Sequence, residues 1–276
     1  MSGDFLAGMA AASRARTDAA KSRVPEEALR ALARELPQPP PLRLDPRGFD
    51  ILAEIKFRSP AAGALQTDGP TVGERAKAYA SAGVAAVSVL TEPARFDGSL
   101  AHLKEAVTAL APSAVPAMRK DFLVDPYQVL EARVAGAGGV LVILRMLSRE
   151  EIDALIAEAR GQGLFVLLEA FDEGDIDAMQ EIISRHGSND RTPLLAGLNS
   201  RDLVTLQVVP HRLETLADRL PRNVVRVAES GVETPDDARR LAAAGYQMAL
   251  IGSALMRAAD PAAAIASLLA AGRSRA

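Results

Sequence analysis

The sequence predicts an α/β fold made of eight strand–helix units. Segments with helical spacing, such as VGERAKAYASAG and PDDARRLAAAG, alternate with short apolar runs rich in β-branched residues. Runs as apolar as VLVIL are typical of parallel strands covered on both faces. Eight such units in about 220 residues, with no G-x-G-x-x-G after the first run, favour a closed (β/α)8 TIM barrel over an open sheet. The runs begin near Ile51, Ala86, Val115, Val140, Phe165, Leu194, Val225 and Met248.

The predicted helices carry start and stop signals. In ETPDDARR, Thr234 is a candidate N-cap with Pro235 at the first helical position. Glycine is favoured just after a helix because it adopts the left-handed conformation without strain. Helix ends are therefore expected at Gly83, Gly136, Gly163 and Gly245.

The first 48 residues precede the predicted barrel. Helical pieces between Phe5 and Arg34 lead into LPQPPPLRLDP, a stiff proline-rich stretch. The spacing of Leu29, Leu32 and Leu36 predicts a helix packed on the barrel. We predict a helical extension with a proline-rich linker at 1–48 and a catalytic (β/α)8 barrel at 49–276.

Composition excludes several classes of protein. With 276 residues, 49% of them apolar, the chain can bury a large core. Its 32 basic and 35 acidic residues give a net charge of −3, which argues against a nucleic-acid partner. The absence of cysteine excludes a thiol nucleophile and fits a cytoplasmic location. No apolar run approaches the roughly 20 residues needed to cross a bilayer, so we expect no membrane association.

The histidines do not suggest a metal or triad site. His102, His186 and His211 are far apart in helical or loop-like stretches. We therefore expect no metal site and no Ser-His-Asp machinery.

Polar residues end most of the predicted strands. In DILAEIKFRSP, strand alternation places Glu54 and Lys56 on one face, and a structural salt bridge is the ordinary explanation for such a pair. The same pattern on six of eight strands instead favours an active site, because barrel enzymes gather catalytic groups at the carboxyl ends of their strands. The residues concerned are Glu54, Lys56, Lys120, Glu169, Asn199, Arg201, Glu229, Ser230, Gly252 and Ser253.

Two loops are suited to phosphate. ESGVETP follows the seventh predicted strand and IGSALMR follows the eighth. Glycine and serine there leave backbone amides free at the start of a short helix, at the usual phosphate position of this fold. We expect a small phosphorylated ligand.

These motifs resemble the indole-3-glycerol-phosphate synthase family over about Ile51 to Ala271. The resemblance is carried by EIKFRSP, SVLTEPARFDGS, MRKDFLVDPYQVLEA, GLNSRDL, VAESGVETP and GSALMR. It implies a carboxy-lyase that closes the pyrrole ring of 1-(2-carboxyphenylamino)-1-deoxyribulose 5-phosphate, with loss of carbon dioxide and water, in tryptophan biosynthesis. It also implies that no metal or organic cofactor is needed. We expect a monomer or weak homo-oligomer.

The resemblance also implies roles for individual residues. Lys120 matches the general acid, and Lys56 matches the lysine that holds the substrate's anionic groups and can protonate the departing hydroxyl. Glu54 and Glu169 match carboxylates that orient these lysines and remove protons. We expect neighbouring charges to bring the lysine pKa values toward working pH. Polar contacts to the substrate are matched by Asn199, Arg201 and Glu229. The phosphate cradle is matched by Ser59, Ser230, Gly231, Gly252 and Ser253. The apolar wall for the aromatic ring is expected to consist of Phe96, Phe122 and Leu141, although each of these side chains would also suit an ordinary core.

Three features depart from the family pattern. The usual SPSKG reads SPAAG, so a basic residue expected near Ala62 is missing. The fifth strand continues into Phe171 where the family more often has histidine, and Arg145 adds a charge that many relatives lack. Three alternatives therefore remain: a paralogue with a shifted substrate, a sugar-phosphate isomerase or aldolase, and a non-catalytic phospholigand-binding protein. The charged strand ends argue against a scaffold role.

Overall fold

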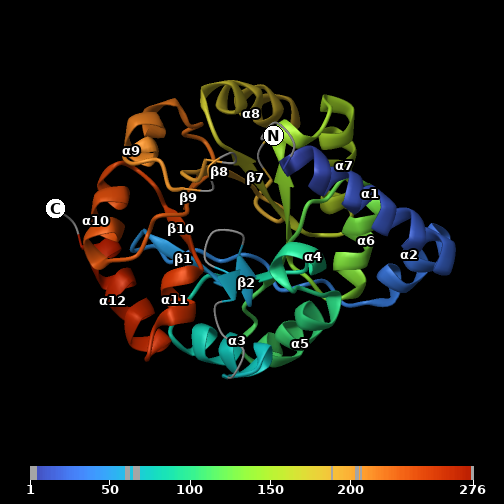
Figure 1. Ribbon diagram of the computed structural model, residues 1–276, viewed down its shortest axis with the longest axis horizontal. Helices are drawn as coiled ribbons and strands as arrows, with labels where there is room; N and C mark the ends of the chain where they lie inside the picture. Colours follow the sequence, from blue (N-terminus) through green and yellow to red (C-terminus); the bar gives the residue numbers. More distant parts are fainter. Residues whose placement is uncertain are drawn as a thin grey trace.

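The computed structural model describes residues 5–59, 63–64, 69–187, 189–202, 205 and 207–274. Eight parallel strands close into a barrel in the order β1-β10-β9-β8-β7-β6-β5-β4, and helices surround it (Figure 1). The predicted (β/α)8 barrel is therefore confirmed. The barrel strands are β1 (Asp50–Ile55), β4 (Ala86–Leu90), β5 (Ala117–Lys120), β6 (Gly139–Ile143), β7 (Phe165–Ala170), β8 (Leu194–Asn199), β9 (Val225–Glu229) and β10 (Met248–Ile251). Two further short strands, β2 (Arg58–Ser59) and β3 (Gly63–Ala64), form a separate antiparallel pair.

The helices begin and end where the local signals predict. Thr234 accepts a hydrogen bond from the backbone amide of Asp237, and Pro235 opens the helix that follows. Gly83, Gly136, Gly163 and Gly245 all have positive φ, between 77° and 92°. The helices around the barrel are α3 (Val72–Ser81), α4 (Pro93–Phe96), α5 (Leu100–Leu110), α6 (Pro126–Val134), α7 (Arg149–Gly161), α8 (Glu173–His186), α9 (Arg212–Leu216), α10 (Pro235–Ala243), α11 (Ser253–Arg257) and α12 (Pro261–Arg273), with 3-10 turns η1 (Ala111–Ser113), η2 (Leu144–Met146) and η3 (Ala217–Arg219).

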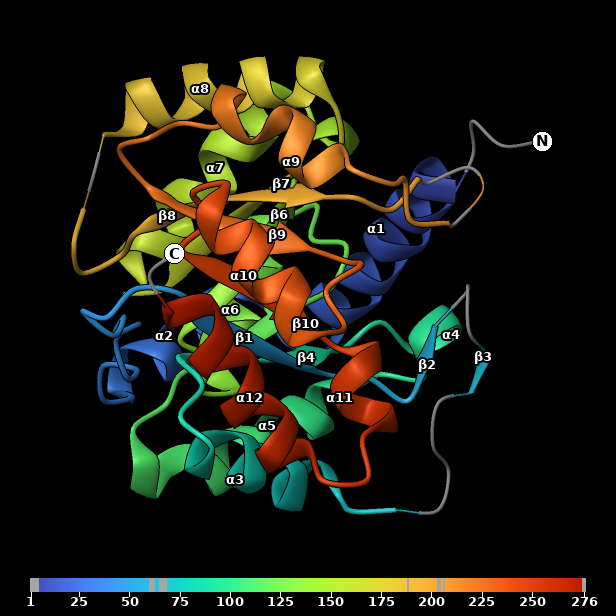
Figure 2. The same cartoon turned by 90° about the vertical axis from the view of Figure 1, so that its left-hand side faces the viewer.

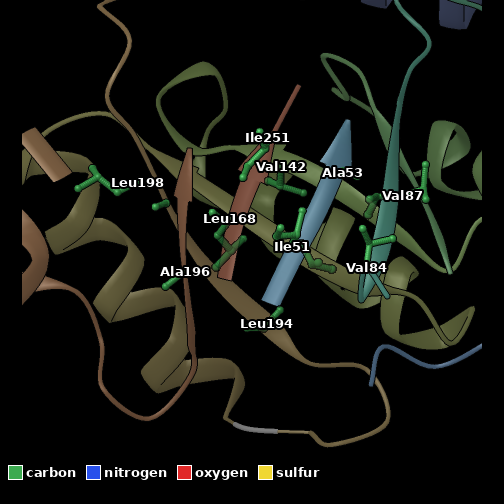
Figure 3. Packing of buried hydrophobic residues seen from close by; sticks show 14 of the residues in the cluster. Ile51, Ala53, Val84, Val87, Val142, Leu168, Leu194, Ala196, Leu198 and Ile251 are labelled. Carbon is green, nitrogen blue, oxygen red and sulfur yellow. The ribbon is translucent and has the colours of Figure 1, made fainter. Parts of the chain in front are cut away.

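Alternation along the strands divides the core into two layers. Ile51 and Ala53 belong to the cluster that packs the strands against the helices (Figure 3). Leu52 belongs to a second cluster with Met118 and Leu167, to which all eight barrel strands contribute, so these side chains fill the barrel interior. Residues that continue the interior row beyond Leu52 must therefore point into the carboxyl-end mouth of the barrel.

The amino-terminal extension forms two helices, α1 (Phe5–Arg23) and α2 (Glu26–Glu35). α2 packs on α6 through Leu29 and Ala33, which contact Tyr127 and Leu130. The expectation that Leu32 packs on the barrel is wrong. Only Leu29 and Ala33 of α2 are buried, and Leu32 is 49% exposed. α1 lies on the same side of the barrel as β2, β3 and α4, beside the carboxyl ends of the strands (Figure 2). The boundary after residue 48 stays a prediction. Of the helices that the structure describes, none combines the length and apolar character needed to cross a bilayer.

Candidate active site

The carboxyl ends of the strands surround a cleft of about 1150 Å³, counting its open mouth. The structure brings together in its lining every predicted site residue whose side chain it describes. Ser59's side chain and Ala62 lie outside the described part of the chain. The lining includes Glu54, Lys56, Phe96, Lys120, Phe122, Leu141, Glu169, Asn199, Arg201, Glu229, Ser230, Gly231, Gly252 and Ser253.

Strand alternation explains this convergence. Glu54 and Lys56 follow Leu52 on the interior row of β1, as Lys120 follows Met118 on β5. Parallel register then brings the rows to one level, and Asn199 of β8 lies opposite Glu229 of β9.

Glu54 lies between two lysines. Lys56 Nζ is 2.5 Å from Glu54 Oε1, and Lys120 Nζ is 3.9 Å from Glu54 Oε2. Burial of Glu54 favours its neutral form, but the charges of Lys56 and Lys120 outweigh burial and hold the pKa of this carboxyl below its usual range. The group is therefore an ionised acceptor at neutral pH.

Lys120 does not follow the expectation from sequence. Burial lowers its pKa, but the nearby carboxylates Glu169, Glu54 and Glu229 together raise the pKa above the ordinary lysine value. The expected shift toward working pH is therefore wrong for Lys120, because the attraction of the neighbouring acidic groups outweighs the desolvation penalty. The ammonium group carries its proton throughout the neutral range.

Glu169 and Glu229 form a carboxyl pair beside Asn199. Asn199 Nδ2 donates to Glu169 Oε1 at 2.6 Å, and its Oδ1 accepts from the Arg201 backbone amide at 2.9 Å. Glu229 is 1% exposed, and neither of its carboxyl oxygens has a hydrogen-bond partner among the described residues. Burial and the neighbouring charge of Glu169 raise the pKa of Glu229 well above its usual range. A protonated Glu229 can donate to Glu169, so the pair can hold one proton.

The loops after the neighbouring strands β9 and β10 both line the cleft. Ser230 and Gly231 have successive positive φ values of 67° and 73°. Gly252 precedes α11 without a side-chain cap, and a Cβ atom there would lie 2.3 Å from Glu54 Oε1 and 2.9 Å from Lys56 Nζ. A side chain at 252 would thus displace the ends of Glu54 and Lys56 from these positions.

The apolar side of the cleft is larger than predicted. Phe96 and Phe122 have ring centroids 6.1 Å apart, and Phe5 from α1 meets Phe122 edge-on at 6.1 Å. The sequence prediction missed Phe5, Leu6, Ile143, Phe171 and Leu250, which also line the cleft. Ile143 and Leu250 follow the alternation of their strands, whereas no local signal reveals Phe5 or Leu6.

A buried ionic network behind Lys120 was also missed. Arg16 of α1 lies 2.8 Å from Asp121 Oδ1 and 3.4 Å from Glu92 Oε1. Glu92 in turn accepts hydrogen bonds from the first amides of α4, the helix that carries Phe96. The extension is therefore tied both to the end of β5 and to the apolar wall.

The histidines occupy ordinary positions away from the cleft. His102 contacts Phe57 edge-on at 5.2 Å, and His186 lies 2.8 Å from Asp153. Within the described part of the chain, no cluster of three or more His, Asp or Glu side chains is arranged to hold a metal ion.

Comparison with known proteins assigns the family. A family model described as indole-3-glycerol phosphate synthase matches residues 6–268. A protein of that name from Opitutus terrae is 39% identical to this chain, over 88% of this chain and 90% of its own length. A second, from Verminephrobacter eiseniae, is also 39% identical, over 97% of this chain and 99% of its own length. The fold is shared with a solved 3-hexulose-6-phosphate synthase from Salmonella typhimurium. That structure is 16% identical, with a TM-score of 0.58, and the match covers 81% of this chain and 98% of its chain. The chain belongs to the indole-3-glycerol phosphate synthase family of carboxy-lyases.

Proposed function

We propose that the cleft binds 1-(2-carboxyphenylamino)-1-deoxyribulose 5-phosphate and closes its pyrrole ring with loss of carbon dioxide and water. The observation that carries the proposal is a cleft in which Lys56 and Lys120 meet the buried carboxyls of Glu54, Glu169 and Glu229, between an apolar wall and two glycine-containing loops. The wall suits the aromatic ring, and the loops suit the phosphate.

Lys120 is proposed as the general acid. The aromatic carbon that bears the carboxylate attacks the ketone carbon, and Lys120 protonates the ketone oxygen as that bond forms. An ammonium group whose pKa is raised by three carboxylates is present in the donating form at every neutral pH. Departure of carbon dioxide then returns the electron pair of the broken C–C bond to the six-membered ring and restores its aromaticity.

Lys56 and the carboxylates are proposed to complete the reaction. Lys56 binds the substrate's anionic groups and protonates the hydroxyl that leaves as water, while Glu54 holds Lys56 in place. Glu169, fixed by Asn199, accepts the proton lost during dehydration. Arg201 and Glu229 contact the substrate's polar groups, and the phosphate lies at Ser59, Ser230, Gly231, Gly252 and Ser253.

The sugar-phosphate aldolase alternative is less well supported. A Schiff-base lysine must lose its proton to act as a nucleophile, so it needs a lowered pKa. The carboxylates around Lys120 act in the opposite direction. Treatment with borohydride and a sugar phosphate is expected to leave Lys120 unmodified.

The decisive experiment is a fluorescence assay for indoleglycerol phosphate. The chain contains no tryptophan, so an indole product is seen without protein background. Indole emission should appear with the wild-type chain and disappear with Lys120→Met. If the purified, folded wild type produces no indoleglycerol phosphate from this substrate, the proposed reaction is wrong.

A further inference from the structure

Arg145 of η2 and Phe171, which directly follows β7, are in contact. The guanidinium carbon of Arg145 lies 4.9 Å from the centroid of the Phe171 ring. This is within the range of a cation–π interaction. Phe171 is 3% exposed, lines the cleft, and comes two residues after Glu169.

Arg145 is itself held by the start of α8. Its side chain pairs with Asp172, and its Nε donates to Asp175 Oδ2 at 2.8 Å. The same Asp175 oxygen accepts from the backbone amide of Phe171 at 2.8 Å. The ring and the backbone of Phe171 are thus fixed by one ionic cluster, which lies beside the proposed proton acceptor.

Phe171 completes the apolar side of the cleft. It belongs to the same buried cluster as Phe122, Leu141 and Ile143. A phenyl ring at 171 offers no hydrogen bond to a ligand and fills space, so this part of the wall selects by shape. The space next to Phe171 therefore limits the size of the substituents on a bound aromatic ring.

We propose that Phe171 determines which substituents are tolerated on the aromatic ring of the substrate, and that Arg145 is a positioning residue that fixes Phe171. This inference rests on the proposed function, because it assumes that the aromatic ring lies against the apolar wall. Close packing makes such selection steep, since one methyl group in an apolar pocket changes kcat/KM by about 10- to 200-fold.

The test compares the parent substrate with analogues that carry one methyl group at each open ring carbon in turn. The selectivity is the kcat/KM for a methylated analogue divided by the kcat/KM for the parent substrate. For at least one analogue, this ratio should be about tenfold or more higher in Phe171→Ala than in the wild type. Phe171→Leu should give a smaller change in the same direction, and it serves as the active reference if the alanine variant folds poorly. An unchanged ratio in the folded Leu variant overturns the role of Phe171.

The role of Arg145 has its own readout. Arg145→Ala should raise KM for the parent substrate several-fold with little change in kcat and should relax selectivity toward the same analogue, while Arg145→Lys restores both. Arg149→Ala is the matched control, because Arg149 pairs with Glu181 of α8 at the exposed surface. If Arg145→Ala lowers Tm but leaves KM and selectivity unchanged, Arg145 is merely structural. Wild-type turnover of the parent substrate tests the proposed function separately.

Discussion

Lys56 Nζ lies 2.5 Å from Glu54 Oε1, in a pair whose two side chains are 13% and 4% exposed. The lysine is the more accessible partner and faces the cleft. Lys120 lies 3.9 Å from the other oxygen of the same carboxylate. Glu54 therefore keeps one cation when the other is removed, so the function of Lys56 can be tested apart from the stability of the barrel.

Lys56→Met should lower kcat/KM by at least about a hundredfold, since it removes a positioned charge and acid. Loss of a buried ion's only partner commonly costs about 3–5 kcal/mol, and the remaining Lys120 should keep the loss here below that range. Steady-state kinetics and urea unfolding measure the two effects. A variant that unfolds far more easily yet retains most of its activity would show that the pair is only a structural salt bridge.

Lys120→Met should lower kcat by about 10²- to 10⁴-fold with little change in substrate affinity, because a general acid acts in the transition state. In the wild type, the raised pKa means that Lys120 keeps its proton up to at least its ordinary pKa of about 10.4. Titration of Lys120 should therefore cause no fall in kcat between pH 7 and pH 10. A fall near pH 8 that Lys120→Arg abolishes would contradict this assignment.

Glu229→Gln should raise Tm at pH 8 by a few degrees and leave it unchanged near pH 4. A carboxyl whose folded pKa is raised contributes its full stability below the unfolded pKa and loses it as pH rises through the folded pKa. Glutamine removes this loss, and its amide can donate to Glu169 as a protonated Glu229 does. Glu233→Gln is the control, because Glu233 lines the cleft but pairs with Arg257 at the surface. Equal wild-type and Glu229→Gln Tm values at both pH values would exclude a protonated Glu229.

Much of the site was predictable because alternation is a local property of strands. Because Leu52 points into the barrel, alternation along β1 makes Glu54 and Lys56 point into its carboxyl-end mouth. The parallel strands then bring Lys120 and Glu169 to the same level. The raised pKa of Lys120 was not predictable, since it depends on the number of carboxylates that other strands bring near it. Phe5 was missed for the same reason: its contact with Phe122 joins residues far apart in the chain.

Sulfate and inorganic phosphate should compete with the substrate, as both can occupy the proposed phosphate cradle. Crystals grown in sulfate should show the anion at the amides of Gly231, Gly252 and Ser253. Gly252→Ala should raise the inhibition constant for phosphate and also lower kcat/KM, because the added Cβ would collide with the Glu54–Lys56 pair. An anion bound elsewhere, with these amides free, would refute the cradle.

Arg16→Ala tests how far the amino-terminal helix contributes to the site. Asp121 and Glu92 are buried, and Arg16 is a cation shared by both. Asp121 also lies 3.2 Å from Arg119, and Glu92 accepts from the amides of α4, so neither carboxylate loses all its partners. The free energy of unfolding should therefore fall by about 1–3 kcal/mol, less than for a fully unpaired buried charge.

The catalytic effect should exceed what this loss of stability explains. Without Arg16, the end of β5 that carries Lys120 and the helix that carries Phe96 lose the ionic link that ties both of them to α1. Both kcat and KM should therefore worsen at temperatures where the variant is fully folded. Arg14→Ala is the matched control, since Arg14 lies on the same helix and its partner Glu151 belongs to α7, away from the cleft. Arg16→Lys should restore part of the activity, because it returns a positive charge but only a single ammonium group to two carboxylates. If Arg14→Ala and Arg16→Ala have equal kinetic effects, α1 supports the barrel only by packing and the Arg16 network does not position the active site.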